Sequence, residues 1–146
     1  MIKAEDLRIG DLVIVNENCS LEQGTIGKVS EVRSTPLYKE NEGSIGLKPI
    51  SNDRWPWGVL CRNIDPIPLT PEILKKNGWK KRTEGWYFMM ISKYMYLSVE
   101  FGYENGIRVF LKRATDGLYV KLNVANNVHE LQHILWALGK DANLKI

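Results

Sequence analysis

The chain has 146 residues, of which 44% are hydrophobic and 25% charged, and its formal net charge is +3. That length predicts one domain or two small ones, and the composition excludes collagen, low-complexity sequence and wholesale disorder. Because no apolar run approaches the roughly 18–20 residues that cross a bilayer and no signal-peptide pattern opens the sequence, we expect a cytoplasmic protein with no membrane partner.

The first part of the sequence predicts short strands separated by glycine turns. Residues 7–15 predict the first strand, and because residues 12–15 are all apolar we expect it to be buried on both faces. Further strands are expected at 24–33, 44–50 and 59–61. Short strands at this spacing are typical of a small barrel.

Within these strands, IGDLVIV followed by GTIGKVSEV resembles the KOW pattern of SH3-like barrels in ribosomal and transcription-elongation proteins. The resemblance covers residues 7–33 and implies an SH3-like β-barrel over residues 1–66. KOW units carry basic residues near their turns, whereas this stretch holds Glu17, Glu22 and Glu31. Because an acidic barrel repels phosphate groups, we do not expect this half to bind nucleic acid.

A proline-rich connector follows the predicted barrel. Three prolines within residues 66–71 favour an extended chain over a sheet or a helix, so we place the boundary between the two halves before residue 67. Thr70 is a suitable N-cap, and Gly78 is a suitable left-handed stop. The sequence therefore predicts a helix over residues 70–77.

The remaining residues predict an antiparallel meander and a closing helix. Asn105-Gly106 is a type I′ hairpin signal, and the basic residues 80–82 are expected in a solvated loop. Apolar residues at helical spacing predict the last helix over 127–138. The four expected strands are 86–91, 94–101, 107–112 and 118–124. The predicted class is α+β: an SH3-like barrel, followed over residues 67–146 by a helix, a four-stranded antiparallel meander and a C-terminal helix.

The two halves differ in charge, with −2 over residues 1–66 and +5 over residues 67–146. Strand alternation in the basic half predicts one face that mixes aromatic and basic side chains: Arg108, Phe110, Lys112, Tyr119 and Lys121. Such faces are typical of proteins that bind single strands. The alternative is a structural pair of Phe110 and Tyr119, with lysine stems lying over the rings. Because the charge is modest, we expect weak nucleic-acid binding or none.

Two tryptophans, Trp55 and Trp57, fall in a polar and irregular loop. One interpretation is that they form a ridge that binds a partner. The other is that they are buried where the two halves meet, because an aromatic side chain buries about 150–250 Å². We expect the halves to pack together through Trp55, Trp57, Trp79 or Trp86.

The segment His129-Glu130-Leu131-Gln132-His133 matches the zinc-protease pattern H-E-x-x-H. Histidines four apart on a helix face the same way and could share a zinc ion, with Glu130 as general base. A catalytic zinc needs a third protein ligand, and downstream only Asp141 is available. We therefore expect no metal site, and we expect His129 and His133 at the edge of the helix or toward solvent.

Four segments, KAEDLRIGDLV, IDPIPLTPEILKKNGW, GWY and VHELQHILWALGKDANLKI, together resemble a family of small uncharacterised proteins of gut Bacteroidetes and their phage-like and mobile elements. The resemblance runs from end to end and is sharpest at PIPLTPEIL…GW. The family pattern has Asn where this chain has His133. The resemblance implies a cytosolic, phage-associated accessory protein and carries over no catalytic residue.

The function expected from the sequence is a non-catalytic interaction module without a cofactor or metal, whose main partner is a protein. Two alternatives stay open: a nucleic-acid-binding accessory protein, and a zinc-dependent hydrolase acting through His129 and His133. The sequence leaves the oligomeric state open. The residues expected to contact a partner are Trp55, Trp57, Arg108, Phe110, Lys112, Tyr119 and Lys121.

Overall fold

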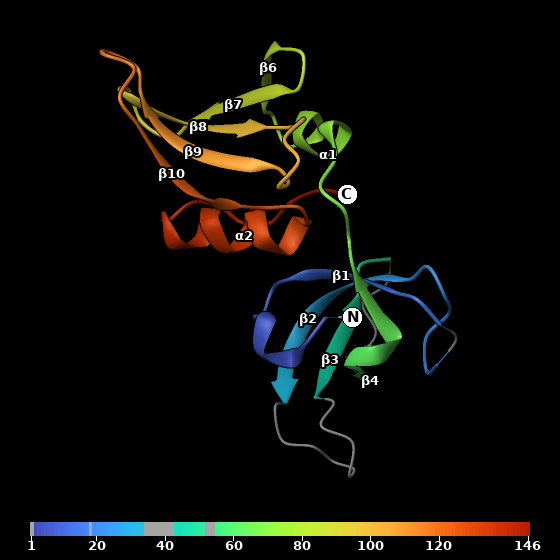
Figure 1. Ribbon diagram of the computed structural model, residues 1–146. Coiled ribbons are helices and arrows are strands. Elements are labelled where there is room, and N and C mark those ends of the chain that lie inside the picture. Colours follow the sequence, from blue (N-terminus) through green and yellow to red (C-terminus); the bar gives the residue numbers. More distant parts are fainter. Residues whose placement is uncertain (1, 18, 34–42, 52–54) are drawn as a thin grey trace. The chain divides into compact units, whose positions relative to one another are not determined.

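The computed structural model describes residues 2–17, 19–33, 43–51 and 55–146. The chain divides into two units, Met1–Ile67 (unit 1) and Pro68–Ile146 (unit 2). Each unit is built on its own five-stranded antiparallel sheet (Figure 1), and unit 2 also contains two α-helices. The predicted α+β class is therefore confirmed. None of the helices in the described residues is long and apolar enough to span a bilayer.

In unit 1 the strands follow the order β4-β3-β2-β1-β5, so the first strand lies between β2 and β5. Two 3-10 turns, η1 (Ala4–Asp6) and η2 (Cys61–Asn63), accompany the sheet. Among the described residues no hydrogen-bonded ladder joins β4 to β5, so the sheet is open and barrel closure is not seen. The strands are β1 (Leu12–Val15), β2 (Ile26–Arg33), β3 (Ser44–Pro49), β4 (Trp57–Leu60) and β5 (Ile64–Pro66).

The strand β5 corrects the expectation that the proline-rich connector starts directly after the fourth strand. Ile64 has no exposed surface, and β5 pairs with β1, with Pro66 opposite Val13. Proline is tolerated because β5 is an edge strand, where an N–H group is not needed on the outer side.

The core of unit 1 lies around β1, which is buried at three of its four positions. This agrees with the predicted burial of that strand on both faces. Val13 and Leu47 both have 0% of their surface exposed. A Cβ atom at Gly27 would come within 2.5 Å of the Leu47 side chain, so the tight packing leaves no room for a side chain at position 27.

In unit 2 the strands follow the order β10-β9-β8-β7-β6, which is a five-stranded meander rather than the predicted four-stranded one. The additional strand, β6, was predicted as a solvated loop. Its residues, KKRT, are all exposed and lack the apolar alternation that signals a strand, but they pair with β7 along the edge of the sheet. The strands are β6 (Lys80–Thr83), β7 (Trp86–Met90), β8 (Met95–Glu100), β9 (Arg108–Arg113) and β10 (Tyr119–Val124).

The connection between β8 and β9 is not the type I′ hairpin that Asn105-Gly106 predicts. A type I′ turn needs a positive φ at both central residues, whereas in the described chain only glycines have positive φ. The Gly106 N–H instead donates to the Tyr103 carbonyl at 3.1 Å, and Gly106 closes that turn with φ +94°. A Cβ atom at Gly106 would lie 2.3 Å from the Asn126 side-chain oxygen.

Both helices of unit 2 begin at predicted capping residues. The helix α1 (Pro71–Lys76) starts after Thr70, whose hydroxyl accepts the Ile73 N–H at 3.4 Å. The helix α2 (Val128–Ala137) starts with a capping box formed by Asn127 and Glu130. Both predicted helices are thus confirmed within one or two residues at each end, the usual uncertainty of helix boundaries.

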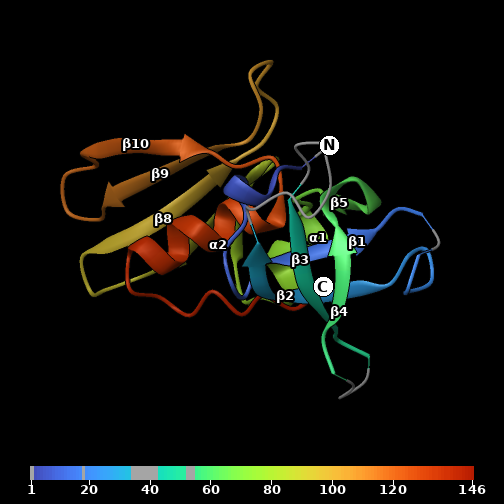
Figure 2. The same ribbon diagram turned by 90° about the horizontal axis from the view of Figure 1, so that it is seen from below.

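The two faces of the unit 2 sheet have different surroundings. The helix α2 lies along one face (Figure 1), and the view from below shows it in front of the strands (Figure 2). That face carries Leu97, Val99 and Val109, and α2 contributes Leu131; each of these four side chains has 0% exposure. The apolar core of unit 2 therefore lies between α2 and the sheet, and the opposite face is left for polar and aromatic residues.

Candidate binding face

The face of the unit 2 sheet opposite α2 is called the open face. Residues paired directly across antiparallel strands point to the same side of a sheet, so the strand register identifies its members. They form three rows that cross the strands. The rows are Met90, Tyr96, Lys112 and Tyr119; Lys80, Phe88, Ser98, Phe110 and Lys121; and Thr83, Trp86, Glu100, Arg108 and Val124.

The five residues that the sequence predicts for this face are brought together as expected. Arg108, Phe110 and Lys112 alternate along β9, and on β10 Tyr119 pairs with Lys112 while Lys121 pairs with Phe110. A register shift after Lys121 ends this regular pairing. The predicted placement depended only on the period of two along each strand, which holds through these positions.

Sequence reasoning missed the contribution of β6 and β7. Lys80 lies opposite Phe88, and the Arg82 guanidinium donates to the Tyr96 hydroxyl at 3.2 Å. Phe88 and Tyr96 form an edge-to-face pair with ring centroids 5.9 Å apart. Their positions on β7 and β8 could have been assigned by alternation from the predicted strands, but Lys80 could not, because β6 had no strand signal.

The middle of the open face is a buried ion pair. Lys112 Nζ contacts Glu100 Oε1, and the two side chains are 14% and 3% exposed. The Glu100 carboxylate also accepts hydrogen bonds from Ser98 Oγ at 3.0 Å and from the Tyr103 hydroxyl at 3.1 Å. These partners satisfy a charge that would otherwise be costly to bury.

The Lys112 ammonium also lies over aromatic rings. It is 4.9 Å from the centroid of Trp86, 5.0 Å from that of Phe110 and 5.9 Å from that of Tyr119. Phe110 and Tyr119 form an edge-to-face pair at 5.7 Å. A paired Phe110 and Tyr119 with a lysine over the rings is the structural role that the sequence offered as the alternative to a binding face. Phe110, at 8% exposure, belongs to the base of the face. Tyr119, at 65% exposure, presents its ring to solvent.

A second cation stacks at the end of the face. The Arg108 guanidinium carbon lies 3.8 Å from the centroid of the Tyr103 ring, a cation–π contact. The hydrogen bond that Tyr103 donates to Glu100 raises the pKa of the Tyr103 phenol, and burial and the Glu100 charge act in the same direction. Arg108 thus stacks on a ring whose hydroxyl is bonded to the buried Glu100 carboxylate.

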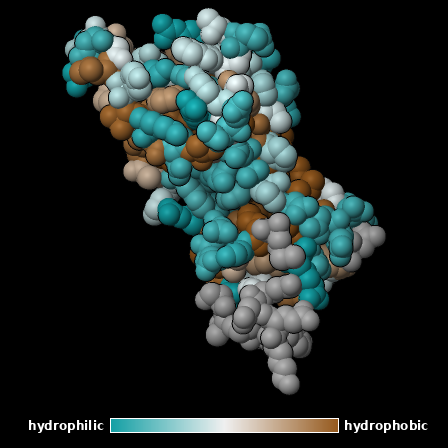
Figure 3. Space-filling model, viewed as in Figure 1, coloured by the Kyte–Doolittle hydropathy of each residue, from teal (hydrophilic) through white to brown (hydrophobic). Residues whose placement is uncertain are grey.

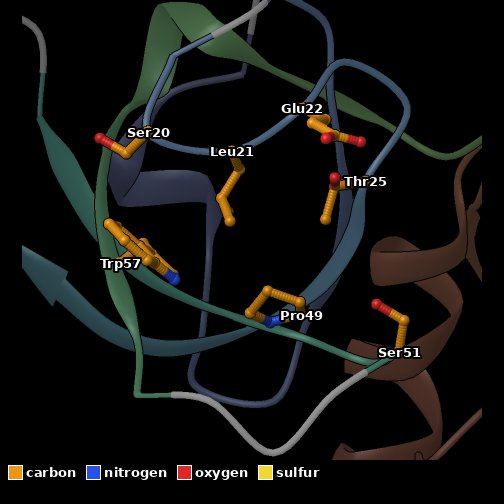
Figure 4. A pocket seen from close by; sticks show the side chains of 7 residues that line it. All are labelled: Ser20, Leu21, Glu22, Thr25, Pro49, Ser51 and Trp57. Carbon is orange, nitrogen blue, oxygen red and sulfur yellow. The ribbon is translucent and has the colours of Figure 1, made fainter.

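The two tryptophans of unit 1 occupy different surroundings. Trp55 is 89% exposed and Trp57 39% exposed. Trp57 lines a pocket of about 370 Å³, into which its ring, Leu21 and Pro49 point (Figure 4). The other lining residues are Ser20, Glu22, Thr25 and Ser51. This pocket offers an apolar wall with hydroxyl groups around it and a single carboxylate.

The H-E-x-x-H segment lies on α2. His129 is only 5% exposed, so the expectation of a solvent position is wrong for this residue, although two positions before Leu131 it lies on a different side of the helix. The rings of His129 and His133 are 5.8 Å apart at their centroids. Glu130 accepts the Asn127 N–H at 2.9 Å and so serves as a helix cap. Among the described residues, no group of three or more His, Cys, Asp or Glu is arranged to hold a metal ion.

Comparison with known proteins gives no assignment: no family model, curated protein or solved structure matches the chain. Figure 3 shows one side of the molecule, on which hydrophilic residues predominate and apolar residues reach the surface in separate patches. Because the comparisons give no assignment, any function must be argued from the residues of this chain.

Proposed function

We propose that the chain is a non-catalytic interaction module that binds an anionic macromolecule through the open face of unit 2. The observation that carries the proposal is the collection of aromatic and basic side chains on the sheet face opposite α2. Rings that are only half-buried, such as those of Trp86, Phe88 and Tyr96, are unusual on a surface that contacts only water, and aromatic residues with arginine are enriched at binding surfaces.

The charge of the open face supports an anionic partner. Its cations are Lys80, Arg82, Arg108, Lys112 and Lys121, while its one carboxylate is Glu100. Because Glu100 is buried and paired with Lys112, four cations are left to attract a partner. A surface with one sign of charge steers a partner of the opposite sign and accelerates its association.

For unit 1 we propose the finer fold predicted from the KOW resemblance, an SH3-like barrel. The strand order supports this, because the last strand already returns to pair with the first, and closure requires only that β4 approach β5. We further propose that the protein acts in the cytoplasm as an accessory protein, as the family resemblance implies. In this arrangement unit 1 would carry its own surfaces, including the Trp57 pocket.

Site-specific photocrosslinking tests the proposed function. A benzophenone amino acid is placed at Tyr119, on the open face, or at Trp136, a control position on α2 that is similarly exposed at 66%. After irradiation in the cells that naturally produce the chain, position 119 should yield a covalent adduct and position 136 should not. Equal adducts at both positions, or none at 119, would contradict a binding role for the open face.

A further inference from the structure

The chemistry of the open face also indicates which anionic partner it fits. We propose that this partner is single-stranded nucleic acid, with phosphates against Lys80, Arg82 and Lys121 and with bases stacked on Phe88, Tyr96 and Tyr119. This inference rests on the proposed function, since it names the partner of the same surface.

The first argument is the arrangement of charge around the rings. Lys80 on β6 and Lys121 on β10 stand at opposite ends of the row that contains Phe88 and Phe110. Five strands about 4.8 Å apart make this row about 19 Å long. A strand of nucleic acid laid along this row and the neighbouring row of Tyr96 and Tyr119 would have rings beneath its bases and cations near its backbone at both ends. Grooves that track the phosphates and rings that stack the bases are the two elements of single-strand recognition.

The second argument is that the rings are accessible to a flat partner. Phe88 and Tyr96 are half-buried and Tyr119 is 65% exposed, while the ion pair and Phe110 below them hold the platform in place. Only an unstacked base can lay its face on such rings, because the bases of a duplex are covered by their neighbours. An acidic peptide could pair with the same cations, but its carboxylates have no aromatic face to stack on these rings.

The third argument concerns charge density. The sequence predicts weak binding or none, because the basic half carries only +5 in total. The structure concentrates four unneutralised cations on one face, and two of them, Lys80 and Arg82, come from the strand that was predicted as a loop. Among the described residues none of the four forms a salt bridge with a carboxylate. Local rather than total charge determines how many phosphates a site can neutralise.

The test measures binding of the full chain by fluorescence anisotropy with four labelled probes. These are a mixed-sequence single-stranded DNA, the RNA of the same sequence, the corresponding DNA duplex, and a poly-glutamate peptide of equal charge. We expect at least one single strand to bind more tightly than the duplex and the peptide. If the three phosphates held by Lys80, Arg82 and Lys121 are neutralised, log K should fall against log salt with a slope of about −2. The two single-stranded probes show whether the site takes RNA or DNA.

Matched variants locate the site. Tyr119→Ala should weaken binding at least about fivefold through loss of one base stack, whereas Tyr119→Phe should retain it. Lys121→Gln should make the salt slope shallower by about 0.7. Trp136→Ala on α2 and Lys76→Gln on α1 change an exposed ring and an exposed lysine elsewhere, and should have no effect. Tyr119 and Lys121 are exposed on an edge strand, so their variants are expected to fold, which the amide spectrum verifies.

The outcomes separate the two proposals. One outcome is that poly-glutamate binds, single strands do not bind, and the open-face variants weaken the binding of the peptide. The nucleic-acid inference is then overturned, while the proposed binding of an anionic partner stands. If no probe binds and position 119 yields no crosslinked adduct, both fail. Equal binding of duplex and single strand, or equal losses in the control variants, would overturn the assignment of base stacking to this face.

Discussion

Replacing Lys112 with methionine should destabilise unit 2, because the Glu100 carboxylate would stay buried without its counter-ion. Glu100 is 2% exposed and the Lys112 side chain 14%. Removing one partner of a buried ion pair costs about 3–5 kcal/mol. Glu100 would keep the hydrogen bonds from Ser98 and Tyr103, so we expect the free energy of unfolding to fall by about 3 kcal/mol, at the lower end of that range.

The free energy would be measured by urea titration, followed through amide hydrogen exchange in β8 and β9 so that it reports on unit 2. Lys121→Met, at an exposed position on the same face, is the control and should change stability by less than about 0.5 kcal/mol. Glu100→Gln should cost less than Lys112→Met, because the ammonium left behind can turn toward water. A loss below about 1 kcal/mol for Lys112→Met, or a loss equal to that of the control, would show that the pair behaves like an exposed salt bridge.

Three further predictions concern other parts of unit 2. Leu131→Ala should lower the free energy of unfolding by about 2–5 kcal/mol, because Leu131 has 0% exposure, whereas exposed Trp136→Ala should have little effect in the same urea titration. Gly106→Ala should cost more than about 1 kcal/mol, because Gly106 has φ +94° and no room for a Cβ beside Asn126; unchanged stability would contradict that geometry. The pKa of Tyr103 is raised by its hydrogen bond to a buried carboxylate. The stabilisation that Tyr103 gives the folded state should therefore be complete below about pH 10, the pKa of tyrosine in the unfolded chain, and be lost as the pH rises through the folded pKa. The difference in unfolding free energy between the natural chain and Tyr103→Phe, measured against pH, should therefore stay constant to about pH 10 and then shrink.

Sequence reasoning predicts well those elements whose signal is local. Thr70 and Gly78 mark the ends of α1, and apolar spacing marks α2, because caps and amphipathic stripes are properties of a few neighbouring residues. The grouping of Arg108, Phe110 and Lys112 with Tyr119 and Lys121 was predictable for the same reason, since alternation along a strand determines the face of each side chain.

The parts that the sequence did not predict depend on contacts between distant residues. The strand β6 has no apolar pattern and exists because β7 offers it a partner edge. The burial of His129 depends on contacts that its place in the helical pattern does not reveal, and the turn that ends at Gly106 lies against Asn126, twenty residues away. Glu100 could not be identified as the centre of the open face, because its partners Lys112, Ser98 and Tyr103 meet only when the strands are paired.

The composition of β6 has a consequence for the solubility of the folded chain. An edge strand offers unpaired N–H and C=O groups to any other chain, and it can seed aggregation through strand-to-strand addition. In β6 this edge is only four residues long and is dense in positive charge, with Lys80, Lys81 and Arg82 all exposed. A second copy approaching along β6 would bring like charges into register, so this border of the sheet is protected against uncontrolled extension by the same residues that make it hard to recognise as a strand.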